Sequence, residues 1–224
     1  MKILQMIGNV AIATSIVTVA VIVSPMSAKA VSFTFNNIPG KDDVGDLFNG
    51  SLSMDVTSSS TGGVLFKFNN IGTNAAPNSY IGSVHISGAL LGTSISVDRE
   101  NVGEVDFKGG IDDKNLSQTN KAEFSTAYYF TKDGGASNGI QKGESLGVLF
   151  SNANFDNVIS AIKGGSLRVG YHLQALPNGA SDAYINNPNT PPTKPVPVPG
   201  FILGVMAAGA LGGTRLLKNK KQAV

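Results

Sequence analysis

The chain has 224 residues, which is enough for one folded domain flanked by short targeting segments. It contains no cysteine, so disulfide bonds, thiolate metal sites and cysteine nucleophiles are excluded. The formal net charge is +2, but residues 31–187 hold ten basic and 15 acidic residues and therefore carry a net charge of −5. An acidic central region repels phosphate backbones, so we expect no nucleic-acid binding.

The first 30 residues have the order of a secretory signal peptide. Lys2 precedes an uncharged run over residues 3–28, and the segment ends in Ala28-Lys29-Ala30. Signal peptidase requires a basic start, an apolar middle and small residues at the cleavage site. We predict that residues 1–30 form a signal peptide, with Ala28 and Ala30 defining the cleavage site. An uncleaved anchor is the alternative, because the apolar run is long enough to cross a bilayer.

Residues 31–187 are predicted to form an all-β ectodomain. Apolar residues mostly alternate with polar ones, and turn residues recur at short intervals. About ten short strands of this kind fit an antiparallel β-sandwich. The candidate strands are Ser32–Asn36, Ser51–Val56, Val64–Phe68, Ile81–Ser87, Ser94–Asp98, Val102–Phe107, Glu123–Thr131, Ser145–Phe150, Leu167–Ala175 and Asp182–Ile185.

One segment of the ectodomain departs from the alternation. Apolar residues between Phe155 and Ile162 recur at helical spacing. Asn154 precedes them as an N-cap and Gly164 follows as a stop signal. We therefore predict a single short helix that packs across one end of the sandwich.

Both histidines fall within predicted strands. The alternation places His85 and His172 on the faces opposite to the apolar residues of their strands. We expect two solvated histidines, with a shared metal or acid–base site as the alternative. The sequence lacks the motifs of serine hydrolases, zinc proteases and P-loop proteins, so we predict that the protein is not an enzyme.

Carboxylates gather at three places in the ectodomain. Calcium is the natural cation for such oxygen-rich clusters outside cells, but the sequence has no EF-hand loop. We therefore expect these carboxylates to lie in ordinary solvated turns and strand edges, with no cofactor. A calcium site is the weaker alternative. The clusters are Asp42, Asp43 and Asp46; Asp98, Glu100, Glu104 and Asp106; and Asp112 with Asp113.

The C-terminal part combines a stiff linker with an apolar segment. Residues 188–199 are rich in proline, which predicts an extended, polyproline-like linker. Residues 200–217 are predicted to be a transmembrane or sorting helix, and residues 218–224 a basic cytoplasmic tail. An excess of lysine and arginine keeps such a tail in the cytosol. The basic cluster consists of Arg215, Lys218, Lys220 and Lys221.

This C-terminal arrangement resembles the PEP-CTERM sorting signal of bacterial surface proteins, and in particular the variant common in cyanobacteria. The resemblance covers about residues 195–224 and rests on the Pro-x-Pro element, the apolar helix rich in glycine and alanine, and the basic end. Its motif residues are Pro195, Pro197, Pro199 and Gly200, and valine replaces the family's glutamate between the prolines. The resemblance implies recognition by an exosortase-like membrane enzyme. A plain membrane anchor is the alternative.

These features predict an exported, non-enzymatic protein of the cell surface or extracellular matrix, anchored in the membrane at least transiently. Its expected partners are signal peptidase, an exosortase-like enzyme and the membrane. An extracellular carbohydrate-binding module is the alternative, and a secreted hydrolase is the third hypothesis. Aromatic side chains stack on sugar rings, and the candidates for such contacts with polysaccharide are Tyr80, Tyr128, Tyr129 and Tyr184. The alternative is that these tyrosines are amphipathic strand residues half in the core.

Overall fold

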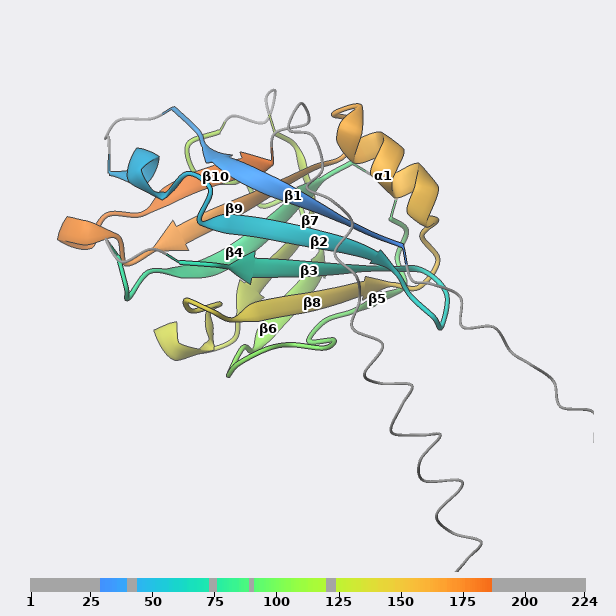
Figure 1. The fold of residues 1–224 in the computed structure, drawn as a ribbon, viewed down its shortest axis with the longest axis horizontal. Coiled ribbons are helices and arrows are strands. Elements are labelled where there is room, and N and C mark those ends of the chain that lie inside the picture. Colours follow the sequence, from blue (N-terminus) through green and yellow to red (C-terminus); the bar gives the residue numbers. More distant parts are fainter. Residues whose placement is uncertain (1–28, 40–43, 73–75, 89–90, 120–123, 187–224) are drawn as a thin grey trace, which may run out of the picture.

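The computed structural model describes residues 29–39, 44–72, 76–88, 91–119 and 124–186, which form ten β-strands, one α-helix and three short 3₁₀ turns (Figure 1). The strands are β1 (Ala30–Asn37), β2 (Leu52–Ser58), β3 (Val64–Asn70), β4 (Tyr80–Ser87), β5 (Ile95–Ser96), β6 (Phe107–Ile111), β7 (Thr126–Lys132), β8 (Ser145–Phe150), β9 (Arg168–Gln174) and β10 (Asp182–Asn186). The helix is α1 (Phe155–Lys163), and the 3₁₀ turns are Gly45–Phe48, Ala136–Asn138 and Pro177–Gly179.

The strands are hydrogen-bonded in one nearly closed antiparallel sheet, in the order β5-β8-β3-β2-β1-β10-β9-β4-β7-β6. The sheet folds into two layers because β1 belongs to both. Its first residues, from Ala30 to Thr34, pair with β2, and its last residues, from Phe35 to Asn37, pair with β10. The first layer therefore holds β5, β8, β3 and β2, and the second layer holds β10, β9, β4, β7 and β6 (Figure 1).

Aromatic side chains fill the space between the two layers. Phe35 stacks on Tyr171 with ring centroids 4.0 Å apart, and Phe68 meets the same tyrosine edge-on at 6.0 Å. Phe150 of the first layer meets Tyr128 of the second edge-on at 5.3 Å. Such pairs add about 0.5–1.5 kcal/mol each to the stabilisation from apolar burial. The predicted alternation thus supplies one continuous core, as an antiparallel sandwich requires.

The edges of the sheet, β5 and β6, are joined by a polar latch, which we define as Asp98 and Asn101 with their partners. The Asp98 carboxylate accepts the backbone N–H of Phe107 at 3.2 Å. Asn101 donates to Asp98 at 2.8 Å and to the Val105 carbonyl at 3.0 Å, and it accepts the N–H of Gly147 in β8 at 2.9 Å. The latch therefore connects β6, at one end of the sheet, with β8, the neighbour of β5 at the other end.

The prediction of a strand over Val102–Phe107 is wrong for most of these residues. In the structure the strand begins where the prediction ends, at Phe107, and continues through Lys108-Gly109-Gly110 to Ile111. Val102 instead makes a single bridge to Ser145. Side-chain hydrogen bonds of the latch compete with a regular ladder in residues 98–105, and a Gly-Gly pair resembles a turn in sequence although here it pairs with β7.

A second, smaller apolar cluster lies on the outer face of the second layer. Residues 112–119 with 124 and 125, between β6 and β7, form what we call the covering segment. Leu116 and Phe124 of this segment are buried against Ala183 of β10. Gly170 of β9 allows this approach, since a Cβ at that position would lie 2.4 Å from Leu116 Cδ2. One face of the sandwich is therefore covered by the chain itself.

The predicted helix is confirmed as α1. Asn154 is its N-cap, and its side chain accepts the backbone N–H of Asn157 at 3.0 Å. Val158, Ile159 and Ile162 are buried, as their spacing predicts. Lys163 lies in the last turn, next to Gly164. The helix lies at one end of the sandwich (Figure 1).

The described residues include no helix that is both long and apolar enough to cross a bilayer. The predicted signal peptide up to Ala28, the linker, the sorting helix and the basic tail lie outside the described residues. Of the predicted cleavage-site residues, Ala30 is the first residue of β1 and pairs with Thr57 of β2.

Candidate functional site

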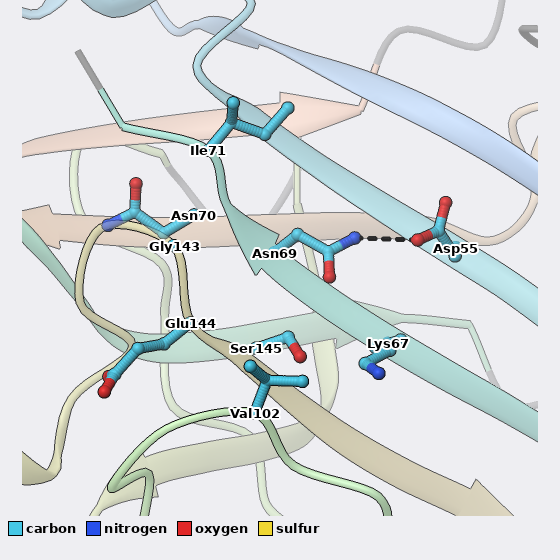
Figure 2. Close-up of a pocket in the computed structure, with 9 residues that line it drawn as sticks. All are labelled: Asp55, Lys67, Asn69, Asn70, Ile71, Val102, Gly143, Glu144 and Ser145. Carbon is cyan, nitrogen blue, oxygen red and sulfur yellow. Dashed lines mark hydrogen bonds between the residues drawn. The ribbon is translucent and has the colours of Figure 1, made fainter.

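A groove of about 380 Å³ lies on the outer face of the first layer, over β3 and β8. Figure 2 shows its side chains, which project from the strands and from the loops at their ends. The groove is open to solvent and mostly polar in its residue types. It is lined by Asp55, Lys67, Asn69, Asn70, Ile71, Val102, Gly143, Glu144 and Ser145.

Strand alternation and register bring the floor of the groove together. Lys67 lies opposite Asp55 of β2, and Asn69 lies opposite Ser145 of β8. Residues that are directly opposite in an antiparallel pair share one face of the sheet. The wall is formed by Val102, whose backbone N–H donates to the Ser145 carbonyl at 3.0 Å and whose carbonyl accepts the Ser145 N–H at 3.0 Å.

Both carboxylates of the groove are already hydrogen-bonded. Asp55 accepts from Asn69 Nδ2 at 2.9 Å and from the Ser32 hydroxyl. Glu144 accepts the backbone N–H groups of Glu104 at 3.0 Å and Gln141 at 2.9 Å. Each carboxylate oxygen thus accepts one hydrogen bond, and the bond to Asp55 orients Asn69. The two carboxylates therefore serve as structural supports of the groove.

Two polar groups of the groove, the Lys67 ammonium and the Ser145 hydroxyl, have no partner among the described residues. Within the described part of the chain, the Lys67 ammonium makes no hydrogen bond or ion pair that the structure records. Ser145 is 4% exposed, and its hydroxyl oxygen lacks a hydrogen-bond partner. Ile71 and Val102 are 57% and 47% exposed, which is high for large apolar residues. This combination of unpaired polar groups and exposed apolar rims is suited to holding a polar ligand that has an apolar side.

The outer face of the second layer holds both histidines, and the prediction of a wet face is wrong for His85. The covering segment lies over it, and His85 is 3% exposed. Its Nδ1 lies 3.1 Å from the Lys114 carbonyl, which can only accept, so Nδ1 carries the proton. Nε2 then accepts the Ser83 hydroxyl at 3.0 Å. Burial lowers the pKa of His85 from 6.5 to about 4.

His172 lies on the same face, half-buried in the neighbouring strand. It is opposite Ser83 in the register, and its Nδ1 lies 3.3 Å from Gln174 Nε2. Burial lowers its pKa, and the charge of Asp182 opposes that shift. The structure thus brings the two histidines onto adjacent strands, as a shared site would need.

The Ser83–His85 pair has the contact of a nucleophile and its base, but both side chains are buried. A substrate carbonyl needs access to the serine oxygen, and the covering segment occupies that side. An imidazole with a pKa near 4 is also a weak base at neutral pH. The Ser83–His85 hydrogen bond is therefore better explained as a contact that satisfies two buried polar side chains than as a catalytic pair.

Two carboxylates of the predicted clusters accept hydrogen bonds from the backbone. Asp98 belongs to the latch, and Asp112 accepts the backbone N–H of Lys114 at 3.1 Å. Among the described residues, no three histidine or acidic side chains lie together in a way that would hold a metal ion. Asp42 and Asp43 lie outside the described residues.

Two of the four candidate sugar-stacking tyrosines are core residues. Tyr128 and Tyr184 are buried, and their hydroxyls donate to the carbonyls of Gly92 at 3.0 Å and Gly45 at 2.8 Å. Tyr129 is half-buried beside His85, with Lys114 Nζ 5.3 Å from its ring centroid. Tyr80 is also half-buried. Tyr128 and Tyr184 therefore follow the alternative of core residues and offer no surface for stacking on sugars.

Sequence reasoning did not identify the groove. The predicted sorting residues Pro195, Pro197, Pro199 and Gly200 and the basic cluster lie outside the described residues. The signal for the groove was the run of polar outward positions in β2 and β3, which alternation alone cannot distinguish from an ordinary wet face.

Comparison with known proteins adds no relative: no protein-family model, curated protein or solved structure matches the chain.

Proposed function

We propose that the protein is an exported, non-enzymatic protein of the cell surface or matrix that binds extracellular polysaccharide through the groove on the first layer. The order of segments along the chain supports export. A signal-peptide pattern precedes the β-domain, and a proline-rich linker, an apolar segment and a basic tail follow it. The PEP-CTERM resemblance of the tail supports sorting by an exosortase-like enzyme.

The observation that carries the binding proposal is the groove. It is an open depression on a rigid sheet, and it combines unpaired hydrogen-bonding groups with the exposed apolar rims of Ile71 and Val102. Sugars present hydroxyl groups at the edge of the ring and C–H groups on its faces, so such a lining matches both. Binding residues on rigid strands are also held in position more precisely than residues on loops.

Glycan binding by the full-length chain tests this proposal. An array of neutral and acidic oligosaccharides is expected to show retention, and Asn69→Ala is expected to weaken it about tenfold because the amide orients ligand hydroxyls. Asn157→Ala, on an exposed turn of α1, is the matched control and is expected to bind normally. If no oligosaccharide is retained, polysaccharide binding is refuted.

Intact-mass measurement on the native protein tests export and sorting. A chain that begins at Val31 indicates signal-peptide cleavage after Ala30, and a chain that also ends near the proline linker indicates processing of the tail. An end at Val224 would instead favour the plain membrane anchor. Cleavage after Ala30 would remove the Lys29–Asp156 ion pair of 3.1 Å, which is exposed and adds little to stability.

A further inference from the structure

We propose that the groove selects an acidic sugar residue, whose carboxylate is bound by Lys67 and whose hydroxyl groups are bound by Asn69 and Ser145. This inference rests on the proposed function, since it names the class of sugar that the same groove takes. It follows from which polar groups of the groove are already used by the protein and which are left for a ligand.

The acidic groups of the groove are used by the protein. Each oxygen of Asp55 and of Glu144 accepts a hydrogen bond from within the chain. An ionised carboxylate with its donors in place has little need of ligand hydroxyls. The two negative charges of the groove, Asp55 in its floor and Glu144 beside it, are therefore already hydrogen-bonded within the chain.

The basic group of the groove is not used. Lys67 lies opposite Asp55, yet within the described residues no ion pair or hydrogen bond of its ammonium is recorded. Two other lysines of the described domain are engaged: Lys108 pairs with Asp133 at 2.7 Å, and Lys132 donates to the Gly134 carbonyl at 2.7 Å. A free ammonium with three donors, at a partly buried position beside a groove, favours an anionic acceptor.

Ser145 provides a second, independent indication. Its hydroxyl is buried without a partner next to the groove, and an unsatisfied buried polar atom is uncommon in folded proteins. It lies opposite Asn69, whose Nδ2 donates to Asp55 and Ser53 while its Oδ1 has no recorded donor. Figure 2 shows Asn69, Ser145 and Lys67 projecting from the neighbouring strands of the groove floor. A ligand hydroxyl between Asn69 and Ser145 would satisfy both.

The rim favours a sugar over other anions. Ile71 and Val102 are exposed on either side of the polar floor (Figure 2), which suits the C–H face of a pyranose ring. A phosphate group would require several donors, usually arginine or a helix N-terminus, and the groove lining contains one lysine and no arginine. The net charge of −5 over residues 31–187 repels polyanions at long range, so recognition depends on this short-range contact.

Binding of a matched pair of probes tests the inference on the full-length chain. The probes are an oligogalacturonate and the same oligosaccharide with its carboxylates fully methyl-esterified, which removes the charge and keeps the hydroxyls. We expect the acid to bind about tenfold more tightly than the ester. Lys67→Met is expected to bring acid binding down to the level of the ester, because it removes the ammonium that distinguishes the two probes. Lys163→Met, on the last turn of α1, is the control and is expected to change neither.

Ser145→Ala separates a binding role from a structural one. We expect it to weaken both probes severalfold without lowering the midpoint of thermal unfolding, because the hydroxyl has no partner to lose in the free protein. Equal affinity for acid and ester, unchanged by Lys67→Met, would overturn the acidic-sugar inference while leaving glycan binding intact. Failure to bind either probe, or any neutral oligosaccharide, would overturn the proposed function as well.

Discussion

Acidification is expected to destabilise the β-domain through His85. Its imidazole is buried beneath the covering segment and donates from Nδ1 to the Lys114 carbonyl. Burial lowers its pKa to about 4, so the unfolded chain, with an ordinary pKa of 6.5, binds the proton more readily than the folded domain does. The stabilisation is therefore complete above pH 6.5 and is lost as the pH falls toward 4.

The size of the effect follows from the difference between the two pKa values. Each pKa unit corresponds to about 1.4 kcal/mol. Relative to pH 7, protonation of this one group lowers the free energy of unfolding by about 2 kcal/mol at pH 5 and about 3 kcal/mol at pH 4. His172 adds to the loss, since burial lowers its pKa as well. Among the facing charges, Asp112 favours protonation of His85 and His172 opposes it.

Denaturant unfolding of the full-length chain between pH 7 and pH 4 measures this loss. In His85→Gln, which keeps an amide donor and acceptor at the site, the pH dependence should be smaller by the amounts given above. An NMR titration of the imidazole in the wild-type chain provides a measurement that does not depend on the variant's folding. A titration midpoint of His85 near 6.5, or identical pH slopes for the two chains, would refute the reasoning.

Three substitutions test the construction of the fold. Asn101→Ala removes three hydrogen bonds of the latch and should lower the free energy of unfolding by about 2 kcal/mol; no change would show that the latch is dispensable. Asn154→Ala removes the cap bond to Asn157 and should cost about 1 kcal/mol in the same assay, with weaker hydrogen-exchange protection in α1. Gly147→Ala would place a methyl group 1.6 Å from the Arg99 carbonyl oxygen, so we expect a loss of about 2–3 kcal/mol; a wild-type midpoint would contradict this packing.

Local patterns were sufficient for most of the strands and for the helix. Strands such as Val64–Asn70 combine alternating apolar residues with turn residues at their ends, so their periodicity predicts both their position and their inner face. The helix was recognisable for the same reason, because its spacing and its Asn154 cap are properties of neighbouring residues. The segment from residue 98 to 105 failed this reasoning, since its conformation depends on hydrogen bonds to β6 and β8, which are distant along the chain.

The candidate groove likewise depends on both local patterns and contacts between distant segments. Alternation within the strands places Lys67 and Asn69 outward, but it does not reveal that Val102 and Glu144 wall them in, because those residues come from other segments. The sequence alone also could not tell that His85 is buried, since an outward strand position is wet only if nothing folds over it.

The amino-acid sequence by itself determined the strand-rich domain, its inner faces and the helix α1, because each is encoded by residues close together in the chain. Only the tertiary structure decided which outer face is covered and which is left open. The covering segment lies over the second layer because Leu116 and Phe124 are buried there against Ala183. Among the described residues, Val102 and Glu144 flank the groove of the first layer on one side only, and the Lys67 ammonium and the Ser145 hydroxyl in it have no recorded partner.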